Sequence, residues 1–393
     1  MFKQNQSAGR RTAVVNDPKF RALVAQGLLV GIVLFCAYSG LKNATSNLAE
    51  QRIASGFGFL GQTAGFGIAQ TLIPWNEAMT YARAYFVGLL NTLTVSLFAI
   101  FFATILGFCV GILRLSPNWT LSRLAKWYVE IVRNLPLLFQ ILFWYLAVLA
   151  TMPAPRSAIS FLDFVFISQR GIAFPRPEFQ EGSWLWAAAM VGGLLLGFAL
   201  RRWSRIEALG AKRTKLSSLA LAIVIFGTFL LLAKFYGSPI AFSIPQKERF
   251  NLTGGLTIIP EFAAFVVALT IYGSAFIGEI VRAGIQAVPK GQTEAGRSLG
   301  IGKRHLLRFI IVPQALRIII PLLTSQYLNI LKNSSLGVSI GYPELVSVGG
   351  TILNQTGQAI EVVAMWMATY LTISLLTSVF MNWYNARIAL VER

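Results

Sequence analysis

Residues 294–313 read EAGRSLGIGKRHLLRFIIVP, a basic segment punctuated by glycine that lies between two apolar runs of the chain. Glycine often ends a helix because it adopts the left-handed backbone conformation at little steric cost. We therefore expect a short helix at Thr293–Leu299, ended by Gly300 and Gly302. A short, stiff helix lying across the axes of two membrane spans would transmit a force without bending.

Three side chains suit the N-terminal end of this short helix. Gln292 or Thr293 is expected to cap it by accepting a hydrogen bond from a free backbone N–H. The Glu294 carboxylate is expected to favour the positive end of the helix dipole.

The composition indicates a membrane protein. Apolar residues make up 55% of the 393 residues and charged residues only 12%, whereas a soluble protein has about 25% charged residues. A helix needs about 20 mainly apolar residues to cross the hydrocarbon core. We therefore expect an all-α polytopic membrane protein with about eight transmembrane helices. Seven uncharged runs are Ala22–Leu41, Ala84–Leu113, Asn134–Pro155, Gly182–Leu200, Leu216–Ala233, Phe262–Gly278 and Val362–Ala386.

The eighth run, Ile318–Leu331, is short and lies between Arg317 and Lys332. At a rise of about 1.5 Å per residue, it is too short to cross the membrane by itself. It can span only if its helix begins near Pro313, or if it carries one of the two cations into the membrane.

The formal charge of +19 is distributed as a membrane protein requires. If the N-terminus is cytoplasmic, the inner segments hold 23 of the 34 Lys and Arg residues and the outer segments hold 8. This asymmetry predicts a multi-pass protein with both termini in the cytoplasm. Nucleic-acid binding would instead gather the cations on one soluble face. We expect no such face and no nucleic-acid partner.

The sequence offers little for catalysis or metal binding. His305 is the only histidine, and no Cys, His or carboxylate partners stand at ligand spacing from it. The chain also lacks the G-x-x-x-x-G-K-[ST] loop that binds nucleotide phosphates. We expect neither a metal site nor a cofactor nor an enzyme, and any ATP must be hydrolysed by another subunit.

The sequence Glu-Ile-Val-Arg occurs twice, at Glu130–Arg133 and at Glu279–Arg282. In each copy the two charges are three residues apart and share one helix face. The expected topology places both copies at a similar depth near the inner end of the helix bundle. Charges at membrane depth are costly unless they are paired. Glu130, Arg133, Glu279 and Arg282 therefore form either an ionic latch for an inner gate or a structural ion-pair network.

The spacing of residues 294–313 resembles the EAA loop of ABC importer permeases, EAA-x3-G-x9-I-x-L-P. Glu294-Ala295-Gly296 is followed at the same spacing by Gly300, by Ile310 and by Val312-Pro313. The chain departs from the pattern with Gly296 where Ala is usual and with Val312 where Leu is usual. The resemblance implies a coupling helix that docks in a groove on the ATPase. The implied coupling residues are Glu294, Ala295, Gly296, Leu299, Gly300 and Pro313.

The resemblance also implies a fold. A type I ABC importer permease has a five-helix core, which here corresponds to residues 84–150 and 260–390. We expect an N-terminal transmembrane helix and periplasmic segment at 1–83, and a permease transmembrane domain at 84–393. The segment 182–236 is expected to be an inserted hairpin.

A second segment, Arg133–Gln140 (RNLPLLFQ), resembles the R-G-T-P-L-L-x-Q segment of polar amino acid permeases. Pro136 removes a helix hydrogen bond and is expected to kink the span. Kinked helices commonly line binding cavities, so Pro136 and Gln140 are candidates for the substrate path. Asn91 and Thr92 resemble the family's N-T-L start, although helix–helix hydrogen bonds explain them equally well.

The sequence Lys332-Asn333-Ser334-Ser335 offers one cation and several donors near the end of the seventh span. Such groups can hold the carboxylate of an amino acid, and Lys332 is the first candidate. The alternative is that the lysine extends to the membrane surface.

Together these segments resemble the polar and general L-amino acid branch of ABC permeases, and the length resembles Aap-type Q subunits. That resemblance implies a bacterial inner membrane location and transport by alternating access. It implies four kinds of partner: ATP-binding subunits that hold ATP and Mg, a similar Aap-type M permease, a periplasmic amino acid-binding protein and the lipid bilayer.

Two rival functions come from other classes. A membrane-embedded enzyme needs carboxylates or histidines clustered at one depth, and only the two Glu/Arg pairs come close. An ion-coupled secondary transporter should show inverted repeats and acidic residues at mid-membrane, which the sequence does not show. Uptake driven by ATP rather than by an ion gradient would distinguish an ABC importer from the second rival.

Overall fold

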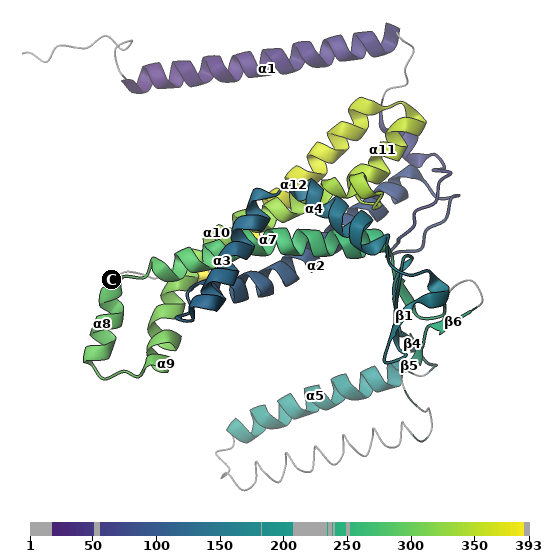
Figure 1. The fold of residues 1–393 in the computed structure, drawn as a ribbon. Helices are drawn as coiled ribbons and strands as arrows, with labels where there is room; N and C mark the ends of the chain where they lie inside the picture. Colours follow the sequence, from purple (N-terminus) through teal and green to yellow (C-terminus); the bar gives the residue numbers. More distant parts are fainter. Residues whose placement is uncertain are drawn as a thin grey trace, which may run out of the picture. The chain divides into compact units, whose positions relative to one another are not determined.

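The computed structural model describes residues 18–50, 56–181, 183–206, 234, 238, 240–248 and 252–388. Most of these residues are helical, which confirms the expected helical class (Figure 1). Eight short β-strands also occur among the described residues, and they form a small part of this mainly helical chain. The strands form three small antiparallel sheets, and every strand lies between residues 159 and 258.

Among the described residues, five helical stretches are long and apolar enough to cross a membrane, and one bent helix pair makes a sixth. They correspond to six of the eight predicted spans. The fourth predicted span falls on α5 (Ser183–Ile206), and the fifth lies outside the described residues. The count of eight therefore stays a prediction. The five stretches are Phe20–Gly40, Tyr81–Arg114, Pro260–Gln286, Lys303–Ile340 and Ala359–Tyr384.

The chain forms two compact units, and the first comprises residues 1–89 and 345–373. Its described elements are α1 (Pro18–Glu50), η2 (Phe57–Gly61), the start of α2 (Tyr81–Arg114), α11 (Leu345–Thr356) and most of α12 (Ala359–Ile388). Its core gathers Phe59, Tyr81, Val348, Ile352 and Val362. The predicted boundary between residues 83 and 84 stays a prediction.

The second unit comprises residues 90–344 and 374–393, and α7 (Pro260–Gln286) is its central helix. Helix α2 packs closely against α7 because Gly107 and Gly111 stand four residues apart on the contact face. A Cβ atom on Gly107 would overlap Ile277, and one on Gly111 would overlap Val281. Small residues at this spacing let two helix backbones approach closely in a membrane.

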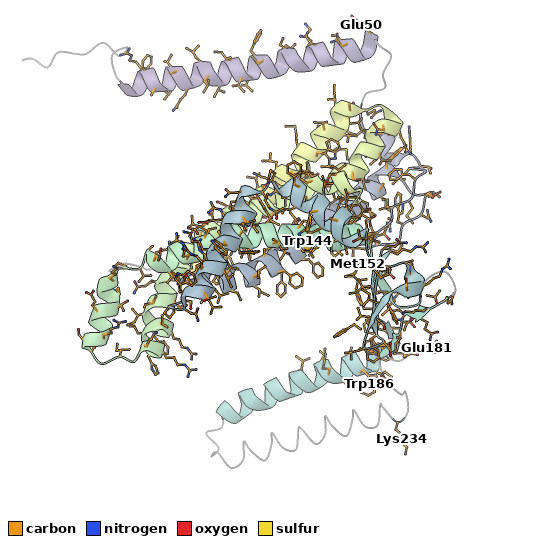
Figure 2. All side chains as sticks on the ribbon, viewed as in Figure 1. Glu50, Trp144, Met152, Glu181, Trp186 and Lys234 are labelled. Atoms are coloured by element: carbon orange, nitrogen blue, oxygen red, sulfur yellow. The ribbon has the colours of Figure 1, made fainter. Side chains whose placement is uncertain are left out.

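Helix α3 (Trp119–Asn134) forms the bent pair with the stretch Leu137–Leu149, which begins with α4 (Leu137–Leu142), and the angle between them is 104°. The break falls at Leu135 and Pro136, which confirms the predicted kink. Pro136 stands just before the first turn of α4, where its missing N–H costs nothing. Helix α4 continues into η3 (Phe143–Leu149), a π-helical stretch that holds Trp144, and Met152 lies in the turn after it (Figure 2).

The seventh predicted span is much longer than its 14-residue apolar run. A 38-residue helical stretch runs through α9 (Lys303–Leu306), η5 (Leu307–Ile311), α10 (Val312–Asn333) and η6 (Ser334–Ile340). Because the helix begins before Pro313, its length is sufficient to cross the membrane.

The β-module, residues 155–181, 240–248 and 252–258, lies between η3 and α7 in the sequence. Its main sheet has the antiparallel order β1-β2-β3-β8, made of Ile159–Phe161, Val165–Ser168, Gly171–Phe174 and Leu256–Ile258. Strands β4 (Arg176–Phe179) and β5 (Ile240–Ser243) pair separately, as do β6 (Gln246–Lys247) and β7 (Leu252–Thr253). Strands this short carry too little alternation to be recognised from the sequence.

Candidate functional site

The predicted loop helix exists as α8 (Lys290–Ser298), which begins three residues earlier than expected. Pro289 precedes it, and no side chain caps its first turn, so the expected cap by Gln292 or Thr293 is wrong. Glu294 is the fifth residue of the helix and is exposed, which places it beyond the first turn where the helix dipole acts. The earlier start follows from Pro289, because proline readily precedes a helix but does not continue one.

The C-terminal end of α8 is closed by backbone hydrogen bonds around Gly300, as predicted. Gly300 has a φ of 71°, and the Ile301 N–H donates to the Gly296 carbonyl at 3.0 Å. The loop then turns back into α9, and Leu306 packs on Gly296. Both residues are buried, and a Cβ atom on Gly296 would overlap the Leu306 Cδ1 atom. Gly296 therefore lets α8 and α9 approach each other.

The outer surface of this loop combines exposed apolar and basic side chains. Leu299 is 79% exposed and Phe309 is 64% exposed. His305 is exposed and its ring stacks on Phe309, with 6.0 Å between ring centroids. Exposed apolar groups rimmed by charge are typical of a protein-binding surface. The cations of this surface are Arg297, Lys303, Arg304 and Arg308.

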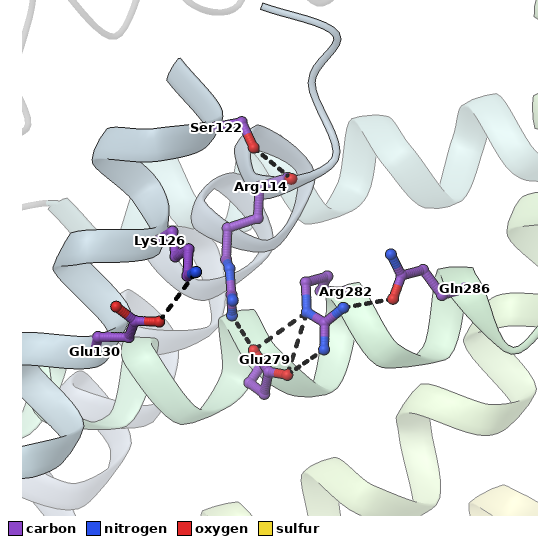
Figure 3. A network of polar contacts seen from close by, with 7 residues as sticks. All are labelled: Arg114, Ser122, Lys126, Glu130, Glu279, Arg282 and Gln286. Carbon is purple, nitrogen blue, oxygen red and sulfur yellow. Dashed lines mark hydrogen bonds and ion pairs between the residues drawn. The ribbon is translucent and has the colours of Figure 1, made fainter. Parts of the chain in front are cut away.

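An ionic cluster lies on α2, α3 and α7 (Figure 3). Glu279 accepts ion-paired hydrogen bonds from both Arg114 and Arg282, and Arg282 also donates to the Gln286 side chain. The Glu279 and Arg282 pair was expected from the sequence. Arg114 was missed, although its position as the last residue of a span was a signal.

The Glu-Ile-Val-Arg copy at Glu130–Arg133 is arranged differently from the copy at Glu279–Arg282. Glu130 pairs with Lys126 at 3.6 Å rather than with Arg133. The Arg133 guanidinium instead lies over the Phe276 ring at 4.9 Å. Glu130 and Arg133 of one copy and Glu279 of the other nevertheless line one cavity of about 340 Å³, together with Arg114, Val129, Asn134 and Phe276. The structure thus brings together the two motifs that the sequence placed at one depth.

The candidate path residues of α2 and α4 are buried. Asn91 and Thr92 are fully buried, and the Asn91 Nδ2 atom donates to the Pro343 carbonyl at 2.9 Å. The Tyr342 hydroxyl donates to the Asn91 carbonyl at 3.2 Å. Burial raises the pKa of Tyr342, and the nearby Glu344 charge raises it further, so this donor keeps its proton.

Gln140 is also buried, and its amide spans the break between α3 and α4. The Nε2 atom donates to the Val132 carbonyl at 3.0 Å and to the Leu135 carbonyl at 3.1 Å. These carbonyls end α3 and have lost their helical partners at the break. Gln140 therefore stabilises the bend, which does not require contact with a substrate.

The polar group at the end of α10 has one accessible cation. Lys332 is exposed and makes no ion pair with the described residues. The Ser334 hydroxyl donates to the Leu331 carbonyl at 2.6 Å, and the Ser335 hydroxyl donates to the Lys332 carbonyl at 2.9 Å. Asn333 is half-buried. Within the described residues, no group of three or more His, Cys, Asp or Glu side chains could hold a metal ion.

Comparison with known proteins gives a family match over most of the chain. The family model described as "Binding-protein-dependent transport system inner membrane component" matches residues 99–390. The general L-amino acid transport system permease protein AapQ of Rhizobium johnstonii is 47% identical, with 96% of this chain and 94% of that protein covered.

Two further relatives also match along nearly their whole length. The putative amino-acid ABC transporter permease protein YhdX of Escherichia coli is 49% identical, with 96% of both chains covered. The glutamate/glutamine/aspartate/asparagine transport system permease protein BztB of Rhodobacter capsulatus is 38% identical, with 98% of this chain and 97% of that protein covered.

Proposed function

This chain belongs to the family of binding-protein-dependent transport system inner membrane components, and on that basis we propose that it carries L-amino acids into the bacterial cell. It is a multi-pass permease subunit of an ABC transporter and not an enzyme. The names of its relatives support amino acids as the substrate class. We place both termini in the cytoplasm, because this orientation puts most of the Lys and Arg residues in cytoplasmic segments.

The observation that carries the proposal is the surface of the α8–α9 loop. Leu299 and Phe309 project from it among cations, and the close contact of Gly296 with Leu306 packs the two helices against each other. Such a surface can dock on a separate ATPase, which binds the ATP and Mg that this chain has no loop to hold. Proposed coupling residues are Glu294, Ala295, Gly296, Leu299, Gly300 and Pro313.

Transport would follow from linkage between nucleotide binding and the two states of the permease. ATP closes the ATPase dimer, the docked loops move together, and the outer mouth opens to a periplasmic binding protein. A similar second permease subunit completes the path. Nucleotide shifts the equilibrium only by its differential affinity for the two states, so the loop contact must differ between them.

The ionic cluster suits an inner gate in this cycle. Arg114 on α2 and Arg282 on α7 share Glu279, whereas the charges on α3 reach α7 only through Arg133 and Phe276. A relative movement of α3 and α7 would open or close the cavity that both helices line. In the path, Lys332 would supply the cation for the substrate carboxylate. The other candidate path residues are Asn91, Thr92, Pro136, Gln140, Asn333, Ser334 and Ser335.

Transport in reconstituted vesicles tests this function. The complex that copurifies with this chain should take up L-amino acids when supplied with ATP and binding protein. The Glu294→Lys variant should insert normally, yet its ATPase activity should no longer be coupled to uptake, because a cation replaces an exposed anion of α8. Glu178→Lys, the same exchange at an exposed residue of β4, should leave uptake unchanged.

Two results would contradict the proposal. Uptake driven by an ion gradient without ATP would identify a secondary transporter. Normal ATP-driven uptake by Glu294→Lys would remove the coupling role from α8 while leaving the family membership intact.

A further inference from the structure

The main sheet of the β-module has one face made entirely of large apolar side chains. In the pairing of β1 with β2, Ile159 lies opposite Ile167 and Phe161 lies opposite Val165. Side chains alternate between the faces of a strand, and directly paired residues share a face. These four side chains therefore lie on the same face of the sheet.

The same face continues across the other two strands. Ile172 of β3 pairs with Ile167 on one side and with Ile258 on the other. Phe174, two residues further along β3, pairs with Leu256. The face therefore consists of two rows with one apolar side chain from each strand, and it contains no polar or charged side chain.

The opposite face of the sheet already has its own cover. Phe166 and Ala173 are buried there, and Leu252 of β7 packs against them. The Lys247 ammonium lies 5.3 Å from the centre of the Phe166 ring and donates to the Ala158 carbonyl at 2.8 Å. The sheet thus packs its mixed face internally, whereas its apolar face meets the helical core only at Ile258 and is otherwise turned outward.

No side chain of the apolar face is fully buried, but exposure varies along it. Five are half-buried, namely Val165, Ile167, Ile172, Phe174 and Ile258, and the other three are exposed. Phe161 is 65% exposed, Ile159 is 52% exposed and Leu256 is 45% exposed. An antiparallel sheet with one packed face normally turns a polar face to water. A continuous apolar face of this kind marks contact with a membrane or with a protein.

The position of the sheet favours the membrane. Strand β8 ends at Ile258, and the membrane-spanning helix α7 begins two residues later at Pro260. Ile258 and Ile259 pack against the main core of the helical unit. The sheet is therefore attached at the end of α7 that is opposite to α8, where a span leaves the hydrocarbon.

We propose that this apolar face rests on the lipid bilayer, with the sheet lying flat at the membrane surface. A typical protein interface is only partly apolar and carries hydrogen bonds, whereas this face has no side-chain donor or acceptor. The sheet cannot enter the hydrocarbon fully, because the unpaired backbone groups of its edge strand β1 need water or lipid headgroups. The proposal concerns membrane seating and does not depend on the substrate.

Site-directed spin labelling of the full complex in lipid nanodiscs tests the proposal. In a background of Cys36→Ser and Cys109→Ser, a nitroxide is placed by Phe161→Cys or by Ser160→Cys, its neighbour on the opposite face. Collision rates with oxygen, which concentrates in lipid, are compared with those of a water-soluble nickel chelate. The ratio of oxygen to nickel collisions should be several-fold higher at position 161 than at 160.

A second pair of labelled positions, on strand β8, controls for local distortion of β1 by the label. Leu256→Cys should behave like position 161, and Thr257→Cys like position 160. Equal nickel access on both faces would place the sheet in water and overturn the proposal. Protection of position 161 from both reagents, or protection only after binding protein is added, would show that protein covers the face and would also overturn it.

Discussion

Gly296 shows how one residue adapts the coupling loop of this chain. The family pattern usually has Ala at this position, but here Leu306 occupies the space where the methyl group would stand. The two positions are therefore coupled: a small residue in α8 allows a large one in α9. Substitution of Gly296 or Leu306 alone should disturb the contact between α8 and α9.

Gly296→Ala should destabilise the α8–α9 contact by about 1–3 kcal/mol, the usual cost of overpacking a well-filled site. The thermal midpoint of the purified permease and the coupling of ATPase activity to uptake should both fall. The double variant Gly296→Ala with Leu306→Ala should recover coupling, because the added methyl group then has room. An unaffected single variant, or a double variant worse than the sum of its parts, would contradict this account.

Glu279 is the shared partner of two guanidinium groups, and its loss leaves both without that anion. Its side chain is 27% exposed and that of Arg114 is 13% exposed, so water replaces the lost contacts poorly. Glu279→Gln should therefore lower the unfolding free energy by about 1–3 kcal/mol. Thermal unfolding in detergent measures the change.

Glu130→Gln is the matched control for this prediction. The Lys126 and Glu130 side chains are 46% and 53% exposed, so their pair should contribute less than about 1 kcal/mol. Equal losses of stability in the two variants would contradict the view that Glu279 is the centre of the cluster.

At the scale of elements, the break between α3 and α4 depends on Gln140 as well as on Pro136. Proline explains why the helix cannot continue, but the carbonyls freed at the end of α3 still need donors. Gln140 supplies both hydrogen bonds from the next helix. The bend is thus held by a side chain that the sequence had suggested for the substrate path.

Gln140→Leu should cost about 1–3 kcal/mol, since a buried carbonyl and a partly buried one lose a donor. If the role is structural, the remaining uptake should show an unchanged preference among amino acids. Phe139→Leu, at the exposed neighbouring position, should change stability little and serves as the control. A stable Gln140→Leu variant with altered selectivity would return this residue to the substrate path.

In the whole molecule, strands β4 and β5 pair with each other and hold together the two ends of the inserted segment 180–239. Phe179 pairs with Ile240, so the two ends of the intervening segment lie side by side. The chain therefore leaves the β-module and re-enters it at the same place. None of the described residues of that segment, 180–181, 183–206, 234 and 238, belongs to the main core cluster of the helical unit.

Replacement of residues 180–239 by Asn-Gly should therefore give a folded permease. Asn-Gly favours the two-residue turn that joins paired strands. The unfolding free energy should change by less than about 1 kcal/mol, as expected for changes away from the core. Membrane accumulation and thermal unfolding, compared with the full-length chain, measure the effect; aggregation or degradation of the shortened chain would show that the insertion supports the core.

Several features could be predicted from the sequence because they depend on residues near one another in the chain. Run length and charge placement indicated a helical membrane protein, and the loop pattern indicated the coupling helix. Six predicted spans have helical counterparts of membrane length. The kink at Pro136 followed from the chemistry of proline alone. In each case the physical cause acts over a few turns of helix.

Other features depend on which distant segments become neighbours, and they arise only when the chain folds. Arg114 meets Glu279 because Gly107 and Gly111 bring α2 against α7, and no local pattern encodes that partnership. The apolar face of the main sheet arises when β8 joins β3 across the insertion. Short strands carry too weak an alternation to show such a face, because its residues become adjacent only after the strands pair.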